Sequence, residues 1–219
     1  MVKITNYGHA CFEISCDGTT LLVDPFLTGN GQAAVTAEEV QPDYILVTHG
    51  HGDHVGDAAA IAKRTGASII TTVDVGEALF GDCPNLVPGN IGGTVQLPFG
   101  SVKFTEAIHG SGVPGALACG FLISIGGKKI WHMGDTALTK NFELYENEVD
   151  CLLVPIGDVF TMGPADALKA VRMVKPKLAI PMHYNTFPFI VQDPQKFAED
   201  VTAAGLSAKV LAPGGSLEI

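Results

Sequence analysis

A short run of histidine and aspartate is the feature of this sequence that can do chemistry. Residues 48–54 read Thr-His-Gly-His-Gly-Asp-His, and the polar members are His49, His51, Asp53 and His54. Imidazole nitrogens and carboxylate oxygens bind zinc, manganese or iron(II), and the lack of a nearby cysteine disfavours a structural zinc site. Three more residues complete a candidate ligand set: His109, Asp135 and His183.

Apolar segments of the length of strands precede these residues. Residues 44–47 come before the cluster, 102–108 before His109, 130–133 before Asp135, and 178–182 before His183. The ends of strands are rigid, and loops that follow them meet at one edge of a sheet. The sequence therefore predicts one site, with Gly50 and Gly52 allowing the first loop to curl.

Weaker candidates occupy similar positions. His9 follows the first predicted strand, and Asp24 either orients a ligand histidine or is a turn residue before Pro25. His132 is expected to be a hydrogen-bonded core residue. Candidates for substrate contact are Asp158, Thr161 and Asn185. The glycine-rich segment 110–115 is either a flap or, as we prefer, a turn.

Composition narrows the class of protein. With 13 Lys+Arg against 23 Asp+Glu, the formal net charge is −10, which argues against nucleic acid as a partner. The five cysteines are odd in number and contain no Cys-x-x-Cys pair, as in a reduced protein. Neither a signal peptide nor a membrane span is recognisable, so a cytoplasmic location is expected.

The remaining pattern predicts a mixed α/β protein. Strands are expected at 2–7, 11–16, 20–23, 44–47, 68–72, 151–156 and 178–182, with further strands between 87 and 130. Helices are expected at 55–64, at 164–175 and after Asp193-Pro194, and short helices near Thr36–Glu39 and Asp74–Glu77. This order favours two mixed β-sheets packed face to face with outer helices, as a single domain over 1–219.

The ligand pattern resembles the metallo-β-lactamase superfamily. Seven residues match in type and order, and the motifs at 8–12, 23–26, 157–163 and 182–188 are similar to small bacterial metal-dependent hydrolases related to ascorbate-phosphate lactonases. The resemblance implies a four-layer αββα sandwich. It also implies one metal on His49, His51 and His109, a second on Asp53, His54 and His183, and Asp135 between them.

The resemblance further implies a dinuclear metal-dependent hydrolase, in which a metal-bridging hydroxide attacks a small ester, lactone or phosphodiester. The two divalent ions are expected to be zinc, with manganese, iron or nickel as alternatives, and Asp53 is the candidate for relaying a proton. A di-iron oxidoreductase and a non-catalytic metal-binding protein of the same fold are the alternatives. Expected partners are a small-molecule substrate and, in a homo-oligomer, another copy of the chain. Phe187, Phe189 and Ile190 are expected to be exposed and to form either such a contact or the rim of a pocket.

Overall fold

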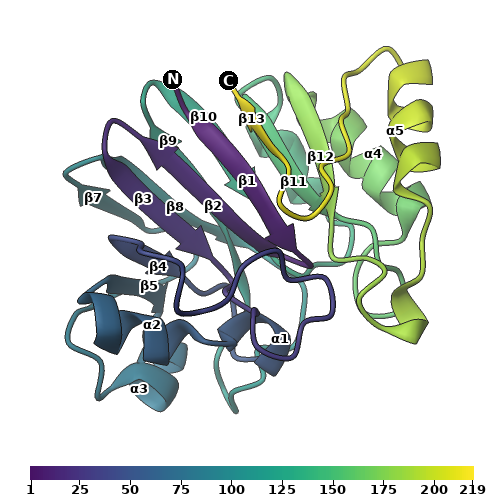
Figure 1. Ribbon diagram of the computed structural model, residues 1–219. Helices are drawn as coiled ribbons and strands as arrows, with labels where there is room; N and C mark the ends of the chain where they lie inside the picture. Colours follow the sequence, from purple (N-terminus) through teal and green to yellow (C-terminus); the bar gives the residue numbers. More distant parts are fainter.

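Two β-sheets lie face to face in the computed structural model, which describes all of residues 1–219 (Figure 1). In spatial order, the first sheet consists of β13 (Ser216–Glu218), β1 (Lys3–Gly8), β2 (Cys11–Cys16), β3 (Thr19–Val23), β4 (Tyr44–Leu46), β5 (Ser68–Thr72) and β6 (Leu86–Gly89). The second consists of β12 (Leu178–Met182), β11 (Cys151–Pro155), β10 (Lys128–His132), β9 (Cys119–Ile125), β8 (Gly100–Glu106) and β7 (Thr94–Leu97).

Both sheets are mixed. Strands β1, β2 and β3 pair antiparallel, whereas β3 to β6 pair parallel. The antiparallel hairpin of β2 and β3 turns at Asp17 and Gly18, whose φ angles of 48° and 84° suit the twist of a two-residue hairpin turn. In the second sheet β10 to β12 are parallel and the other pairs are antiparallel. Parallel pairing places the ends of β3, β4, β11 and β12 beside those of their neighbours.

Helices cover the outer face of each sheet. The helices are α1 (Gly52–Val55), α2 (Ala58–Thr65), α3 (Val73–Phe80), α4 (Pro164–Val174) and α5 (Pro194–Ala203), with short 3₁₀ turns η1 (Lys140–Tyr145) and η2 (Pro188–Ile190). Helices α2 and α3 contact β5, while α4 and α5 contact β11 and β12 (Figure 1). The predicted four-layer αββα sandwich is confirmed.

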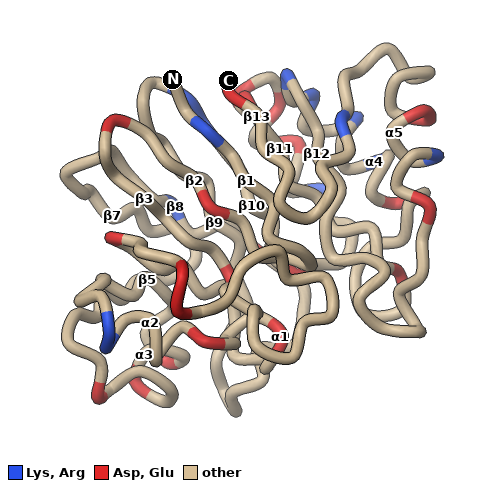
Figure 2. Tube along the Cα trace, in the orientation of Figure 1, with Lys and Arg blue, Asp and Glu red and all other residues tan.

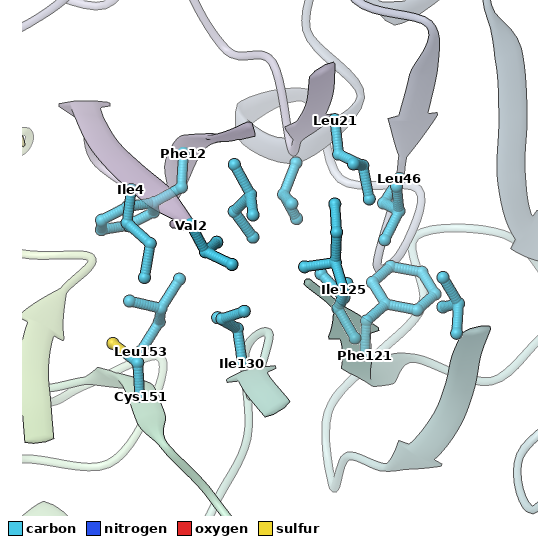
Figure 3. Close-up of a cluster of buried hydrophobic side chains, with 14 of the residues drawn as sticks. Val2, Ile4, Phe12, Leu21, Leu46, Phe121, Ile125, Ile130, Cys151 and Leu153 are labelled. Atoms are coloured by element: carbon cyan, nitrogen blue, oxygen red, sulfur yellow. The ribbon is translucent and has the colours of Figure 1, made fainter. Parts of the chain in front are cut away.

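Three apolar layers hold these elements together. A cluster of 22 buried residues fills the space between the sheets, where side chains such as Ile4 and Phe12 face Leu153 and Ile130 (Figure 3). Separate clusters lie between the second sheet and α4 and α5, and between the first sheet and α2 and α3. The two sheets are thus fixed relative to each other, and loops at their shared edge are held at defined distances.

Most predicted elements occur with small shifts in their ends, but two predictions are wrong. Thr36–Glu39 forms a turn instead of a helix, in which Thr36 N–H donates to the Glu39 carboxylate at 2.7 Å. The predicted helix at 55–64 is two helices, α1 and α2, separated at Gly56. That glycine has φ of 41° and lies against the backbone of Pro25, so the chain cannot continue as a helix there.

The cysteines form no disulfide, and all but Cys83 are buried. None of the helices combines the length and the apolar character that crossing a membrane requires.

Candidate metal centre

Loops that follow five strands converge at one edge of the sandwich, beside the short helix α1 (Figure 1). The loops after β1 and β4 come from the first sheet and carry His9 and the 49–54 cluster. The loops after β8, β10 and β12 come from the second sheet and carry His109, Asp135 and His183. The structure therefore brings together all seven of the predicted site residues and one more, His9.

Three histidines form the first group, composed of His49, His51 and His109. The Nδ1 atom of His51 lies 3.0 Å from His49 Nε2 and 3.2 Å from His109 Nε2. Nitrogens about 2.0–2.1 Å from a tetrahedral ion are separated by about 3.3 Å, so the observed spacing suits one shared metal. Burial lowers the pKa of both His49 and His109, which keeps these rings neutral and available as ligands.

The second group contains Asp53, His54, His183 and His9. Asp53 Oδ2 lies 4.0 Å from His54 Nε2 and 3.8 Å from His183 Nε2. It also lies 3.2 Å from His9 Nε2, whose side chain is buried. The structure thus places His9 in the site itself, whereas the sequence indicated only that it follows a strand.

Asp135 lies between the two groups. Its Oδ1 atom is 3.3 Å from His54 Nε2, and its Oδ2 atom is 3.1 Å from His183 Nε2 and 3.6 Å from His109 Nε2. Several of these buried atoms have no hydrogen-bond partner, namely Asp135 Oδ1, His54 Nε2, and both ring nitrogens of His183. Unpartnered buried polar atoms are rare and costly, and a metal ion would satisfy atoms that converge in this way.

The buried carboxylate of Asp24 forms a hydrogen bond with His54 on the side of the ring that faces away from the site. Asp24 Oδ2 accepts hydrogen bonds from His54 Nδ1 and from the Thr48 hydroxyl, both at 2.7 Å. Its Oδ1 atom accepts from Thr48 N–H at 2.8 Å. A carboxylate on Nδ1 fixes the ring orientation and leaves Nε2 facing the site, as in many metal centres. Of the two interpretations from the sequence, the orienting one agrees with the structure.

Burial, hydrogen bonds and neighbouring charges shift the pKa values of three residues of the site. Burial alone would raise the pKa of Asp53, but the hydrogen bond from His9 and the charge of His54 outweigh it and lower the pKa below its usual range. Burial lowers the pKa of His9 to about 4, so its ring is neutral at neutral pH. For His54, burial acts downward, yet Asp135 and Asp24 outweigh it and raise the pKa well above its ordinary value.

Glycines allow the first loop to approach the loop after β8. Gly50 N–H donates to Ser111 O at 2.6 Å, and a Cβ on Gly50 would lie 2.9 Å from that oxygen. Gly112 has φ of 73°, and a Cβ there would lie 2.8 Å from the His51 ring. By contrast, a Cβ on Gly52 would meet nothing within 4 Å, so the close approach depends on Gly50. Segment 110–115 is a turn that packs on the first loop.

Left-handed backbone conformations gather in the same loops. Nine residues other than glycine have positive φ, and six of them follow strands that end at this edge: His9, Asp24, Asp158, Val159, His183 and Asn185. Each such residue costs about 1–2 kcal/mol, and strained positions of this kind concentrate at functional sites. His183 N–H also donates to His9 O at 2.9 Å, which joins two of the strained residues across the two sheets.

The other candidate residues have simpler surroundings. The His132 ring is buried and hydrogen-bonded to Ala10 O, as expected for a core histidine. Asp158, Thr161 and Asn185 each hydrogen-bond to backbone atoms of their own loops. Ile190 is fully buried and lies against Gly157 of the loop after β11, so the prediction that it is exposed is wrong.

Comparison with known proteins agrees with this arrangement. A family model described as the β-lactamase superfamily domain matches residues 3–183. A UPF0173 metal-dependent hydrolase from Symbiobacterium thermophilum is 49% identical over 97% of this chain and 98% of its own length. The corresponding protein of Methanopyrus kandleri is 44% identical over 99% of this chain and 100% of its own.

Solved structures show the same fold. Igni18, a metallo-hydrolase from Ignicoccus hospitalis, superposes with a TM-score of 0.93 at 33% identity and covers 100% of this chain and 99% of its own. CmlA, a di-iron β-hydroxylase from Streptomyces venezuelae, has a TM-score of 0.78 at 15% identity, with 54% of its chain covered, and so shares the fold alone. By its close relatives, this chain belongs to the β-lactamase superfamily, among the metal-dependent hydrolases of UPF0173.

Proposed function

We propose that this metal-dependent hydrolase uses two divalent metal ions to hydrolyse a small ester, lactone or phosphodiester. One observation carries the proposal: the Asp135 carboxylate lies within 3.6 Å of ring nitrogens from both ligand groups, and buried nitrogen and oxygen atoms without partners converge there. His49, His51 and His109 would hold the first ion, and Asp53, His54 and His183 the second. When bound, such a metal pair polarises the substrate oxygen and lowers the pKa of a water molecule.

The chain contains several residues that position these groups. Asp24 orients His54 through its hydrogen bond with Nδ1. The ligand atoms themselves are nitrogen and oxygen, which suit zinc or manganese. His9 supports Asp53: its neutral ring accepts from the Thr186 hydroxyl at Nδ1 (2.8 Å) and donates from Nε2 to the carboxylate. We place His9 among the positioning residues for this reason.

Asp53 is our candidate for handling a proton. Its side chain is 27% exposed, whereas that of Asp135 is 3% exposed, so Asp53 is the carboxylate of the site that meets solvent. Its lowered pKa keeps it ionised at neutral pH and makes it a weak base. Such a carboxylate can orient a water molecule and pass a proton on to the leaving group, but it does not retain the proton.

The test is metal content by elemental mass spectrometry, paired with hydrolysis of a lactone and a phosphodiester before and after chelation. We expect about two equivalents of metal and turnover that is lost on chelation and restored by zinc or manganese. Bound iron with oxygen consumption would instead indicate an oxidoreductase. A fully metallated protein inert toward both substrates would indicate a non-catalytic role.

A further inference from the structure

Exposed apolar side chains gather on the loops around the candidate metal centre. Ten large apolar residues of the chain are exposed, and six of them lie on the loops after β8, β11 and β12. These six are Ile108, Leu117, Val159, Phe160, Phe189 and Val191, with exposed fractions between 50% and 71%. Exposed apolar residues gathered on loops that carry or border candidate ligands point to a binding surface.

Contacts between these loops place them beside the metal groups. A Cβ on Gly157 would lie 3.1 Å from His183 Nδ1, so the loop after β11 borders that ligand. The Phe160 ring of this loop lies 6.4 Å from the Phe189 ring of the loop after β12. On the opposite side, the loop after β8 packs against the His51 ring through Gly112.

Two further aromatic rings pack against His9 beside the second metal group. Phe26 and Phe187 are half-buried, with ring centroids 6.2 Å apart. Both meet the His9 ring edge to face, at 5.7 Å and 5.5 Å. Because His9 contacts Asp53 of the second metal group, this aromatic pair lies next to the candidate metal centre.

Positive charge is absent from the same loops. Segments 24–43, 48–57, 107–118, 133–139, 156–163 and 183–193 contain no lysine or arginine, although the chain has 13 such residues. The cationic residues lie on α2, on strands, on η1, on α4 and α5 and in the segments that follow these last two helices, whereas the loops beside α1 carry acidic residues or none (Figure 2). Proteins that bind phosphate or carboxylate groups usually supply arginine, lysine or a helix N-terminus for them.

We propose that the substrate is an uncharged molecule with an apolar body, seated on Phe26 and Phe187, an inference that rests on the proposed hydrolase function. The metal pair would take the single reacting carbonyl or phosphoryl group, and the aromatic pair would take the remainder of the molecule. Away from the metal pair these loops offer no cation, so an anionic substituent remote from the reacting group finds no partner there. This argument favours substrates without a remote charge, such as neutral esters and lactones, over substrates such as sugar phosphates that carry an anionic group away from the reacting centre.

The first experiment compares two esters that differ by one remote charge, phenyl acetate and 4-acetoxybenzoate. The carboxylate makes the second ester intrinsically no less reactive, so a preference for the first reports binding. We expect the metal-loaded protein to favour phenyl acetate by at least about tenfold in kcat/KM, mainly through KM. An equal or higher kcat/KM for the anionic ester would overturn the inference while leaving the hydrolase function intact.

Two variants locate the surface. Phe187→Ala is expected to raise KM for phenyl acetate by about tenfold with unchanged metal content. Phe189→Lys is expected to narrow the preference between the two esters, because it supplies the missing cation at the rim. The matched control is Leu144→Ala on η1, an exposed apolar residue outside these loops, which should change neither constant. Unchanged KM in Phe187→Ala would contradict the assignment of this residue.

A binding measurement separates this inference from the function on which it depends. Saturation-transfer NMR on the metal-loaded protein compares acetanilide, which is neutral, with 4-acetamidobenzoate, which is anionic. Stronger binding of acetanilide, weakened by Phe187→Ala, supports the inference even if no ester is hydrolysed. Stronger binding of the anion overturns it. A dimer in light scattering that Phe189→Lys converts to a monomer would also overturn it, by assigning the apolar residues to self-association.

Discussion

Asp24 and His54 are 30 positions apart in the chain, yet their buried side chains meet with Oδ2 and Nδ1 separated by 2.7 Å. Neither side chain is exposed to solvent. The contact leaves the opposite nitrogen, Nε2, 3.3 Å from Asp135 and directed into the site. The orientation of the candidate ligand His54 therefore depends on Asp24, a residue that is not itself a candidate ligand.

Asp24→Asn tests this dependence. Asparagine tolerates the left-handed backbone at this position, where φ is 45°, so the change removes charge and an acceptor without new backbone strain. We expect metal affinity to fall by about 10–100-fold. Asp57→Asn is the matched control, because Asp57 accepts backbone hydrogen bonds from Leu27 and Thr28 and contacts no ligand. Equal affinities in wild type and Asp24→Asn, measured by competition with a chelator, would refute the orienting role.

His51→Ala tests the first group. The ring of His51 lies within 3.2 Å of both other histidines of the group, so its loss should release one metal equivalent and lower kcat/KM by more than about 100-fold. The fold should persist, because His51 lies outside the three apolar clusters. Elemental analysis and circular dichroism of the purified variant provide the measurements, and normal metal content with normal turnover would exclude His51 as a ligand.

Asp135→Asn is expected to act on both groups together. Asp135 contacts His109 of the first group and His54 and His183 of the second. An amide ligand lacks the charge that balances two cations, so both metal equivalents should bind more weakly. Stepwise metal titration measures this effect. Loss of a single equivalent, with the other unchanged, would count against a position shared by the two ions.

His9→Asn tests the support of Asp53. The variant keeps a hydrogen-bonding side chain and tolerates the φ of 58° at this residue, but its shorter amide no longer reaches both Thr186 and Asp53. We expect kcat to fall by about tenfold with metal of the first group retained. A positioning role also predicts a changed pH profile of kcat, because the hydrogen bond from His9 lowers the pKa of Asp53. An unaltered profile would leave His9 without that role.

Metal uptake should release a proton. Since the pKa of His54 is raised well above its ordinary value, the metal-free protein holds this ring protonated at neutral pH. A metal ion must displace that proton, so affinity should rise about tenfold per pH unit until pH exceeds the raised pKa. The contribution of His54 to the stability of the metal-free fold changes with pH in the opposite direction. It is fully present below the pKa of about 6.5 that histidine has in the unfolded chain, and it is lost as pH rises through the raised pKa of His54 in the folded chain.

Calorimetry in two buffers with different ionisation enthalpies counts the released protons between about pH 6 and 8. Asp24→Asn is the companion variant, since Asp24 contributes to the raised pKa, and it should release fewer protons per metal bound. Metal binding that is independent of pH over this range would show that His54 is neutral before the metal arrives.

The sequence anticipates the parts of this protein that depend on local pattern. Strands 11–16, 68–72 and 178–182 have the predicted ends, because turn residues or a buried apolar run define them directly. The break between α1 and α2 depends on contact of Gly56 with Pro25, a long-range approach that no local pattern encodes. Likewise, the contact between the His9 ring and Asp53 joins residues 44 positions apart in the chain, and no local pattern encodes it. The signal for His9 was present nonetheless, because it also directly follows a strand.

The metal groups have an architectural consequence, because each draws residues from both sheets. In the first group His49 and His51 come from one sheet and His109 from the other. In the second, His54 and Asp53 come from the first sheet and His183 from the second. Each bound ion would therefore cross-link the two sheets at this edge of the sandwich. Because only the folded chain brings these ligands together, metal binding would add to the free energy of unfolding. Scarcity of metal would then lower the stability of the fold as well as the activity.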